Sequence, residues 1–152
     1  MRLQYVALIL SFNLFQVAQA EVSFGTKVDG DLGVSIQVDD LKNTAYHVGL
    51  SMSPGTYAKI DIEYLVFPYA LRTSRLWGTT YEVHTYYGFG ARGESTANDP
   101  MHELFYGKIP VGLLLKSYTS SLQAFIDASP KLGPLPTLSM TPMFRIGLRT
   151  RI

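Results

Sequence analysis

The chain has 152 residues, a formal net charge of +1 and no cysteine, which excludes a disulfide scaffold, a thiolate zinc site and a lipidated N-terminal cysteine. Charged residues make up 16% of the chain, below the ~25% typical of soluble domains, whereas Tyr (10) and Phe (8) are abundant. This balance gives no basic face for nucleic acid and suits a protein with a large surface out of water.

The first twenty residues have the pattern of a secretory signal peptide. Arg2 supplies a short positive region, residues 6–15 are mostly apolar, and Ala18-Gln19-Ala20 fits a cleavage site. A membrane anchor is the alternative, but the stretch is shorter than the ~20 apolar residues that a spanning helix needs. We therefore expect residues 1–20 to be removed after Ala20 and residues 21–152 to form one domain of zero net charge.

The remaining chain alternates between apolar residues and polar or small ones, which is the period of a β-strand with two different faces. No segment shows sustained helical periodicity. Turn signals such as Pro54-Gly55 separate eight alternating runs. The runs occupy residues 22–28, 32–38, 46–52, 58–66, 81–91, 105–116, 122–128 and 144–152.

The connections between these runs are turns and loops. The longest, residues 68–78, 92–103 and 129–136, are expected to be loops. Pro110 falls inside a run and removes one ladder hydrogen bond, so a bulge or an interior water is expected there. Eight strands joined in this way predict an all-β, eight-stranded, antiparallel, up-and-down barrel without a free edge.

Alternation alone does not say which face of the barrel points outward. A soluble, lipocalin-like periplasmic barrel would enclose its apolar face around an apolar ligand, whereas a transmembrane barrel would turn that face toward lipid. The polar face favours the transmembrane barrel, because it is rich in Gly and Ser and therefore fits the crowded interior of eight strands. Aromatic residues near the ends of runs are typical of interfacial girdles, and the run lengths bracket the ~9–11 residues of a tilted spanning strand.

Ionisable side chains on the polar face form a candidate interior network. Their signs are mixed, so they can pair across the interior, where a lone buried charge is costly. We expect this network to be structural. Its predicted members are Lys59, Asp61, Glu63, Glu82, His84, Lys108, Asp127, Arg145 and Arg149.

Glu82 and His84 are two residues apart on one strand face, which is the spacing of a base and an orienting carboxylate in a lipid-modifying enzyme. No serine in a distinctive motif accompanies them, so the structural network is the favoured interpretation. One His with one Glu, as at His102 and Glu103, does not make a metal site. We expect no enzymatic activity and no cofactor, and we assign no catalytic, ligand-binding or metal-binding residue.

Four segments of the C-terminal half follow one another in a recognisable order. They are Tyr87-Gly88-Phe89-Gly90-Ala91-Arg92, Lys108-Ile109-Pro110-Val111-Gly112-Leu113, Phe125-Ile126-Asp127-Ala128-Ser129-Pro130 and Ile146-Gly147-Leu148-Arg149. Together they resemble a family of small, uncharacterised, bacterial outer-membrane β-barrel proteins with G-x-G-A-R, basic-x-P-x-G-L, F-x-E-x-x-P and G-x-R strands. Asp127 stands where that family usually has Glu. The resemblance covers residues 80–152 and implies the fold and the location, but no activity.

These observations lead to one favoured hypothesis and two alternatives. The favoured hypothesis is a monomeric, integral outer-membrane barrel of a Gram-negative cell envelope, with a structural or loop-mediated role. Its expected partners are membrane lipid or lipopolysaccharide and the outer-membrane insertion machinery, and not nucleic acid. The alternatives are the soluble periplasmic barrel and the lipid-modifying enzyme described above.

Overall fold

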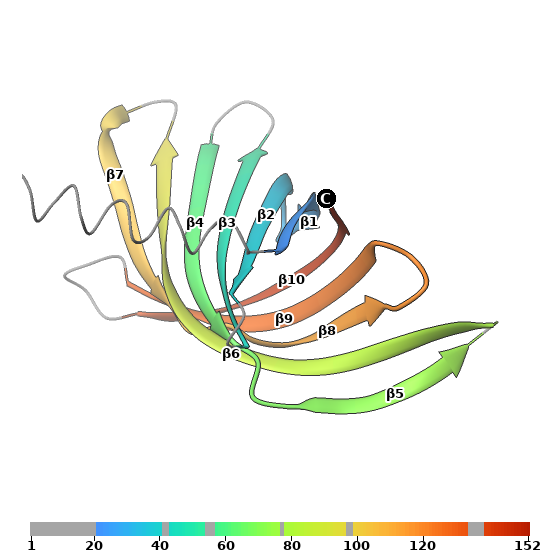
Figure 1. Cartoon of the computed structure of the whole chain (residues 1–152). Coiled ribbons are helices and arrows are strands. Elements are labelled where there is room, and N and C mark those ends of the chain that lie inside the picture. Colours follow the sequence, from blue (N-terminus) through green and yellow to red (C-terminus); the bar gives the residue numbers. More distant parts are fainter. Residues whose placement is uncertain (1–20, 41–42, 54–56, 77, 97–98, 134–138) are drawn as a thin grey trace, which may run out of the picture.

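The computed structural model describes residues 21–40, 43–53, 57–76, 78–96, 99–133 and 139–152 (Figure 1). Its strands are β1 (Glu21–Val28), β2 (Leu32–Asp40), β3 (Thr44–Ser53), β4 (Tyr57–Val66), β5 (Ala70–Leu76), β6 (Thr79–Thr96), β7 (Asp99–Lys108), β8 (Val111–Ser117), β9 (Leu122–Leu132) and β10 (Met140–Arg151). The predicted signal peptide lies outside the described residues. Within those residues, no helix has the length and apolar character needed to cross a membrane.

The strands form one antiparallel sheet that closes on itself. β4 and β5 follow one another along one edge of β6, and β7 and β8 follow one another along its other edge. Each of these two pairs therefore acts as one interrupted strand, so the described segments make eight barrel strands. β10 pairs with β1 from Ser23↔Arg151 to Val28↔Ile146, which closes the barrel. The prediction of an all-β, eight-stranded, antiparallel, up-and-down barrel is confirmed.

Strand parity decides which side chains face the interior. On β4, Asp61 and Glu63 are buried, whereas Ile60 and Ile62 are 43% and 56% exposed. A small group of buried apolar and aromatic side chains also lies inside, and its members are Ala45, Leu65, Phe67, Tyr86, Leu114 and Phe125. The outer face is mainly apolar and the interior holds ion pairs, so this interior is not the apolar ligand cavity that the soluble-barrel alternative requires.

The prediction that residues 68–78 form a loop is wrong, because β5 lies there and pairs with β6. A register shift between Ala70 and Arg72 breaks the alternation at the start of β5, which hides the strand from a search for period 2. The other two predicted loops are also shorter than expected. β6 continues to Thr96 and β7 begins at Asp99, and β9 continues to Leu132.

Pro110 lies between β7 and β8 without shifting the register against β6. Gly90 pairs with Lys108 before the proline, and Tyr87 pairs with Val111 after it. Between these pairs, the Gly88 backbone N–H donates to the Pro110 carbonyl oxygen at 2.9 Å. The bulge that was one expected outcome is therefore absent on the β6 side, and the proline removes one ladder hydrogen bond, the one that its missing N–H would donate to the Gly88 carbonyl oxygen.

Two strand segments leave the closed part of the barrel with one open edge. Among the described strands, β5 pairs with β6 alone. β7 pairs with β9 only at Gly107↔Leu132 and Lys108↔Lys131, so the rest of β7 has β6 as its partner. Figure 1 shows β5 and the first half of β6 extending away from β1, β2 and β3, and β7 lying on the opposite side. The sheet is thus closed in its middle and staggered at both ends.

Candidate functional site in the barrel interior

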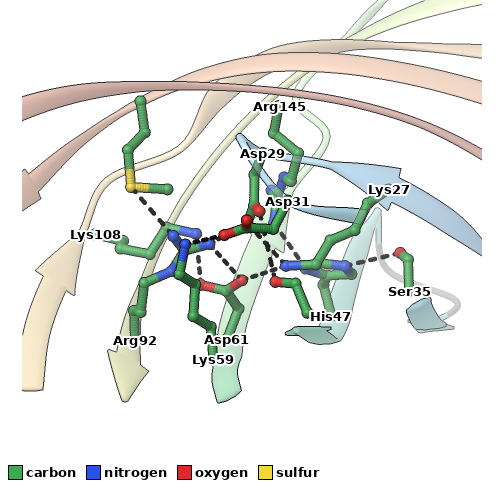
Figure 2. Close-up of polar contacts among 12 residues, drawn as sticks. Lys27, Asp29, Asp31, Ser35, His47, Lys59, Asp61, Arg92, Lys108 and Arg145 are labelled. Atoms are coloured by element: carbon green, nitrogen blue, oxygen red, sulfur yellow. Dashed lines mark hydrogen bonds and ion pairs between the residues drawn. The ribbon is translucent and has the colours of Figure 1, made fainter. Parts of the chain in front are cut away.

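Asp61 lies at the centre of the interior charge network. Its carboxylate accepts hydrogen bonds from Lys27 Nζ at 2.5 Å, from Arg92 Nε at 2.7 Å and from Lys108 Nζ at 2.9 Å. Lys27 also donates to Asp29 at 3.0 Å, and Arg92 donates to the same carboxylate (Figure 2). Since these cations come from β1, β6 and β7, one carboxylate on β4 connects four strands across the interior.

A second group of charges surrounds Glu63. Arg145 donates to both carboxylate oxygens of Glu63, at 2.8 and 3.0 Å, and to Asp127 at 2.7 and 2.9 Å. Such bidentate contacts between Arg and a carboxylate are the stronger kind of ion pair. Lys108 Nζ donates to Glu63 at 2.5 Å and so joins this group to Asp61. The Tyr86 hydroxyl donates to Asp127 at 2.5 Å.

His47 fills the space between the second group and β2. Its Nδ1 lies 2.9 Å from Glu63 Oε2, and its Nε2 lies 2.9 Å from Ser35 Oγ. The ring also stands edge-on to Phe125, with 6.3 Å between the ring centroids. Because both ring nitrogens have partners, His47 serves as a fixed bridge between two strands.

The charges of this central network are balanced among the residues that the structure describes. The network consists of the cations Lys27, Arg92, Lys108 and Arg145, the carboxylates Asp29, Asp61, Glu63 and Asp127, and the bridging His47. All of these side chains are buried. Eight strands enclose an interior that side chains fill, and these ion pairs occupy its middle.

The structure brings five of the predicted network residues together. These five are Asp61, Glu63, Lys108, Asp127 and Arg145. The other predicted residues lie elsewhere. Lys59 pairs with Asp31 at the rim, and Arg149 donates to Gln37 nearer the end of the barrel where β1 begins.

Sequence reasoning missed several central members of the network. Lys27 is four residues after Ser23, so the two side chains point to the same face of the strand. Strict alternation from Ser23 onward therefore identifies Lys27 as an interior residue. Arg92 falls in a predicted loop, and Asp29 falls between the predicted runs 22–28 and 32–38. The register places Arg92 opposite Asp61, and Lys27 and Arg92 then bind Asp29. Nothing in the local pattern separates His47 from other polar residues of its run.

Glu82 and His84 lie together at the mouth of the barrel where β1 begins. His84 Nε2 is 3.0 Å from Glu82 Oε2, and the Tyr118 hydroxyl donates to Glu82 at 2.7 Å. This hydrogen bond raises the pKa of Tyr118. Within the described residues no serine hydroxyl contacts this pair, and no group of three or more histidines and carboxylates is arranged to hold a metal ion.

No known protein family matches the sequence, and no curated protein is similar enough to match. The chain is similar in structure to the N-terminal β-barrel domain of Pseudomonas aeruginosa OprF, with a TM-score of 0.56 over 88% of this chain and 96% of that chain. The two sequences are 11% identical, so the likeness concerns the fold. Fold and interior together define a small, closed, antiparallel β-barrel with a charged interior. The resemblance of residues 80–152 to a particular family stays a prediction.

Proposed function

We propose that this chain is an integral outer-membrane barrel with a structural role in a Gram-negative cell envelope. The observation that carries the proposal is that apolar side chains cover the outside of the barrel and ionisable side chains fill its interior. Large apolar side chains of successive strands are exposed, among them Phe24, Ile36, Leu50, Ile62, Phe89, Leu113, Ile126 and Ile146. A contiguous apolar surface of this kind is a liability in water, whereas acyl chains cover it without cost. The likeness to the OprF barrel domain supports an outer-membrane location.

An outward row of aromatic side chains supports a membrane boundary. Tyr46, Tyr64 and Phe89 are direct neighbours across β3, β4 and β6. The ring centroids of Tyr46 and Tyr64 are 5.3 Å apart, and those of Tyr64 and Phe89 are 5.5 Å apart. Aromatic girdles of this kind lie where hydrocarbon meets the polar headgroups.

The backbone pairing fits the same location. Lipid offers no hydrogen-bond partner to a backbone group, so a β-protein can span it only as a closed barrel. The open edges of β5 and of the outer part of β7 lie toward opposite ends of the barrel. We place the hydrocarbon layer between them, with both open edges in water or among headgroups.

The balanced interior suits a barrel that is closed to solutes and carries no catalytic centre. We propose that residues 1–20 direct export and are removed after Ala20, and that the insertion machinery then places the barrel in the membrane. In the membrane, the outer face contacts phospholipid or lipopolysaccharide. A single chain completes the barrel through β10 and β1, which favours a monomer.

Cell fractionation tests this proposal. The full chain, expressed in a Gram-negative host, is expected in the outer-membrane fraction with Glu21 as its first residue. In detergent it should migrate faster on a gel before heating than after heating, because a closed barrel resists unfolding by detergent. Recovery of the folded chain from the soluble periplasm, without a need for detergent, would contradict the proposal.

A further inference from the structure

A second set of polar side chains lies in the interior, between the central network and the mouth where β1 begins. Ser23 on β1, Gln123 on β9 and Arg149 on β10 all point inward, and each is at most 2% exposed. Gln123 and Arg149 are direct cross-strand partners. Ser23 pairs with Arg151, two residues from Arg149. The three side chains therefore lie beside one another on three adjacent strands.

Several polar atoms of these three side chains have no partner in the protein. They are the hydroxyl of Ser23, both amide atoms of Gln123 and Nε of Arg149. Buried polar atoms in proteins are normally hydrogen-bonded, and each exception needs an explanation. Here the unpartnered atoms belong to neighbouring side chains. Three of them are hydrogen-bond donors: a hydroxyl, an amide N–H and a guanidinium N–H.

The charge of Arg149 separates this group from the balanced central network. Arg149 Nη1 donates to the amide oxygen of Gln37, and the guanidinium lies 4.1 Å from the centroid of the Phe125 ring. Among the described residues, Arg149 forms no ion pair with a carboxylate. Arg145, two residues earlier on the same face of β10, is a further cation.

The carboxylates nearest to this group already have cationic partners. Asp39 accepts a hydrogen bond from Lys116 at 3.2 Å as well as one from Gln37. Asp127 accepts two hydrogen bonds from Arg145, at 2.7 and 2.9 Å. Within the described part of the chain, Arg149 is therefore a buried cation without a carboxylate in ion-pair contact, and an uncompensated buried charge is costly.

We propose that Arg149, Gln123 and Ser23 form a binding site for one small inorganic anion of about the size of a halide. The Arg149 Nε–H, the Gln123 amide N–H and the Ser23 O–H all donate to it, and its charge balances the guanidinium. A water molecule pairs with the amide and the hydroxyl equally well, but it leaves the charge of Arg149 uncompensated. The Phe125 ring covers one side of the guanidinium, so we expect the ion to be monatomic or similarly small.

An ion would reach this site from the mouth of the barrel. A cavity of about 370 Å³ is lined there by Asp39, His84 and Lys116, among others. Lys116 is the direct cross-strand neighbour of Gln123, so the cavity ends one residue pair away from the proposed site. Carboxylates also line this mouth, including Glu21 and Asp40, so the preference for an anion comes from Arg149 and not from the entrance.

Chloride-dependent stability tests the proposal on the protein purified in detergent. The unfolding midpoint is measured while chloride replaces gluconate, which is too large for the interior, at constant ionic strength. A bound anion raises the midpoint by about 4 °C for each tenfold increase in chloride above its dissociation constant. Arg149→Gln should lose this slope. Lys59→Gln, which removes a rim cation paired with Asp31, should keep it.

A second measurement does not depend on the folding of a variant. Crystals of the unaltered protein grown in bromide should show an anomalous peak beside Arg149 Nε. Equal midpoints in chloride and gluconate, together with no bromide peak at this position, would overturn the anion site and assign these polar atoms to water. A chloride slope that persists in Arg149→Gln would overturn it as well.

Discussion

Asp61 accepts hydrogen bonds from cations on three other strands while its own strand, β4, is flanked by β3 and β6. Burying an ion pair gives little net stability, because each charge first loses its water. Removing one partner is different, since it leaves the opposite charges buried and uncompensated. The contribution of Asp61 is therefore to fix the geometry of the interior, and its loss should be costly.

Asp61→Asn should lower the free energy of unfolding by about 3–5 kcal/mol, as measured by urea titration in detergent or lipid. The matched control is Asp31→Asn, which alters a partly exposed carboxylate paired with Lys59 at the rim. That change should cost about 1 kcal/mol or less. Equal losses in the two variants would show that the central network has no special role.

Gly90 lies on the crowded interior face of β6. A Cβ atom there would clash with the Ile62 carbonyl oxygen and would lie 2.7 Å from Glu63 Cγ. Gly90→Ala should therefore destabilise the barrel by about 1–3 kcal/mol, because backbone has to shift. Gly107→Ala is the control, since the closest atom to its Cβ would be 3.8 Å away, and its urea midpoint should stay near that of the unaltered protein. A larger loss for Gly107→Ala than for Gly90→Ala would contradict the packing described here.

At the scale of strands, alternation predicts where most elements lie, because a strand with one apolar and one polar face repeats every two residues. It fails at β5, where the register shift near Arg72 breaks the repeat and a proline precedes the strand. It also fails to place Arg92, because polar residues continue past the end of the apolar run. The identity of the ion pairs depends on register between distant strands, which no local pattern contains.

The open edge of β5 leads to a prediction about its surroundings. Since lipid cannot satisfy an unpaired strand edge, β5 should lie outside the hydrocarbon layer. The chain has no cysteine, so single cysteines can report this directly. In liposomes solubilised only enough to admit the reagent to both sides, Leu71→Cys should react readily with a charged maleimide, whereas Ile62→Cys should not.

Leu71 and Ile62 are a matched pair, because both are apolar and their exposures are similar, at 58% and 56%. Exposure alone therefore predicts equal labelling of the two positions. Fast labelling of Ile62→Cys, or protection of Leu71→Cys, would require a different position of the membrane relative to the barrel.

At the scale of the whole molecule, closure of the barrel separates an apolar outer surface from a charged interior. β10 pairs with β1, so the contact that completes the barrel joins the two ends of the described chain. The sequence predicts closure only through the even number of runs, because no pattern within one strand specifies its distant partner. Once the barrel is closed, strand parity sorts the side chains into an apolar outer surface and a charged interior.

The central claim is that the outer surface of this barrel contacts acyl chains. The most direct test is the nuclear Overhauser effect between lipid and protein protons in nanodiscs. The methyl groups of Ile60, Leu113 and Ile126 should show strong effects from acyl-chain methylene protons, and the side-chain methylene protons of Lys27 and Asp61, which point inward, should show none. Effects from water protons at those methyl groups, without any from acyl chains, would contradict the account.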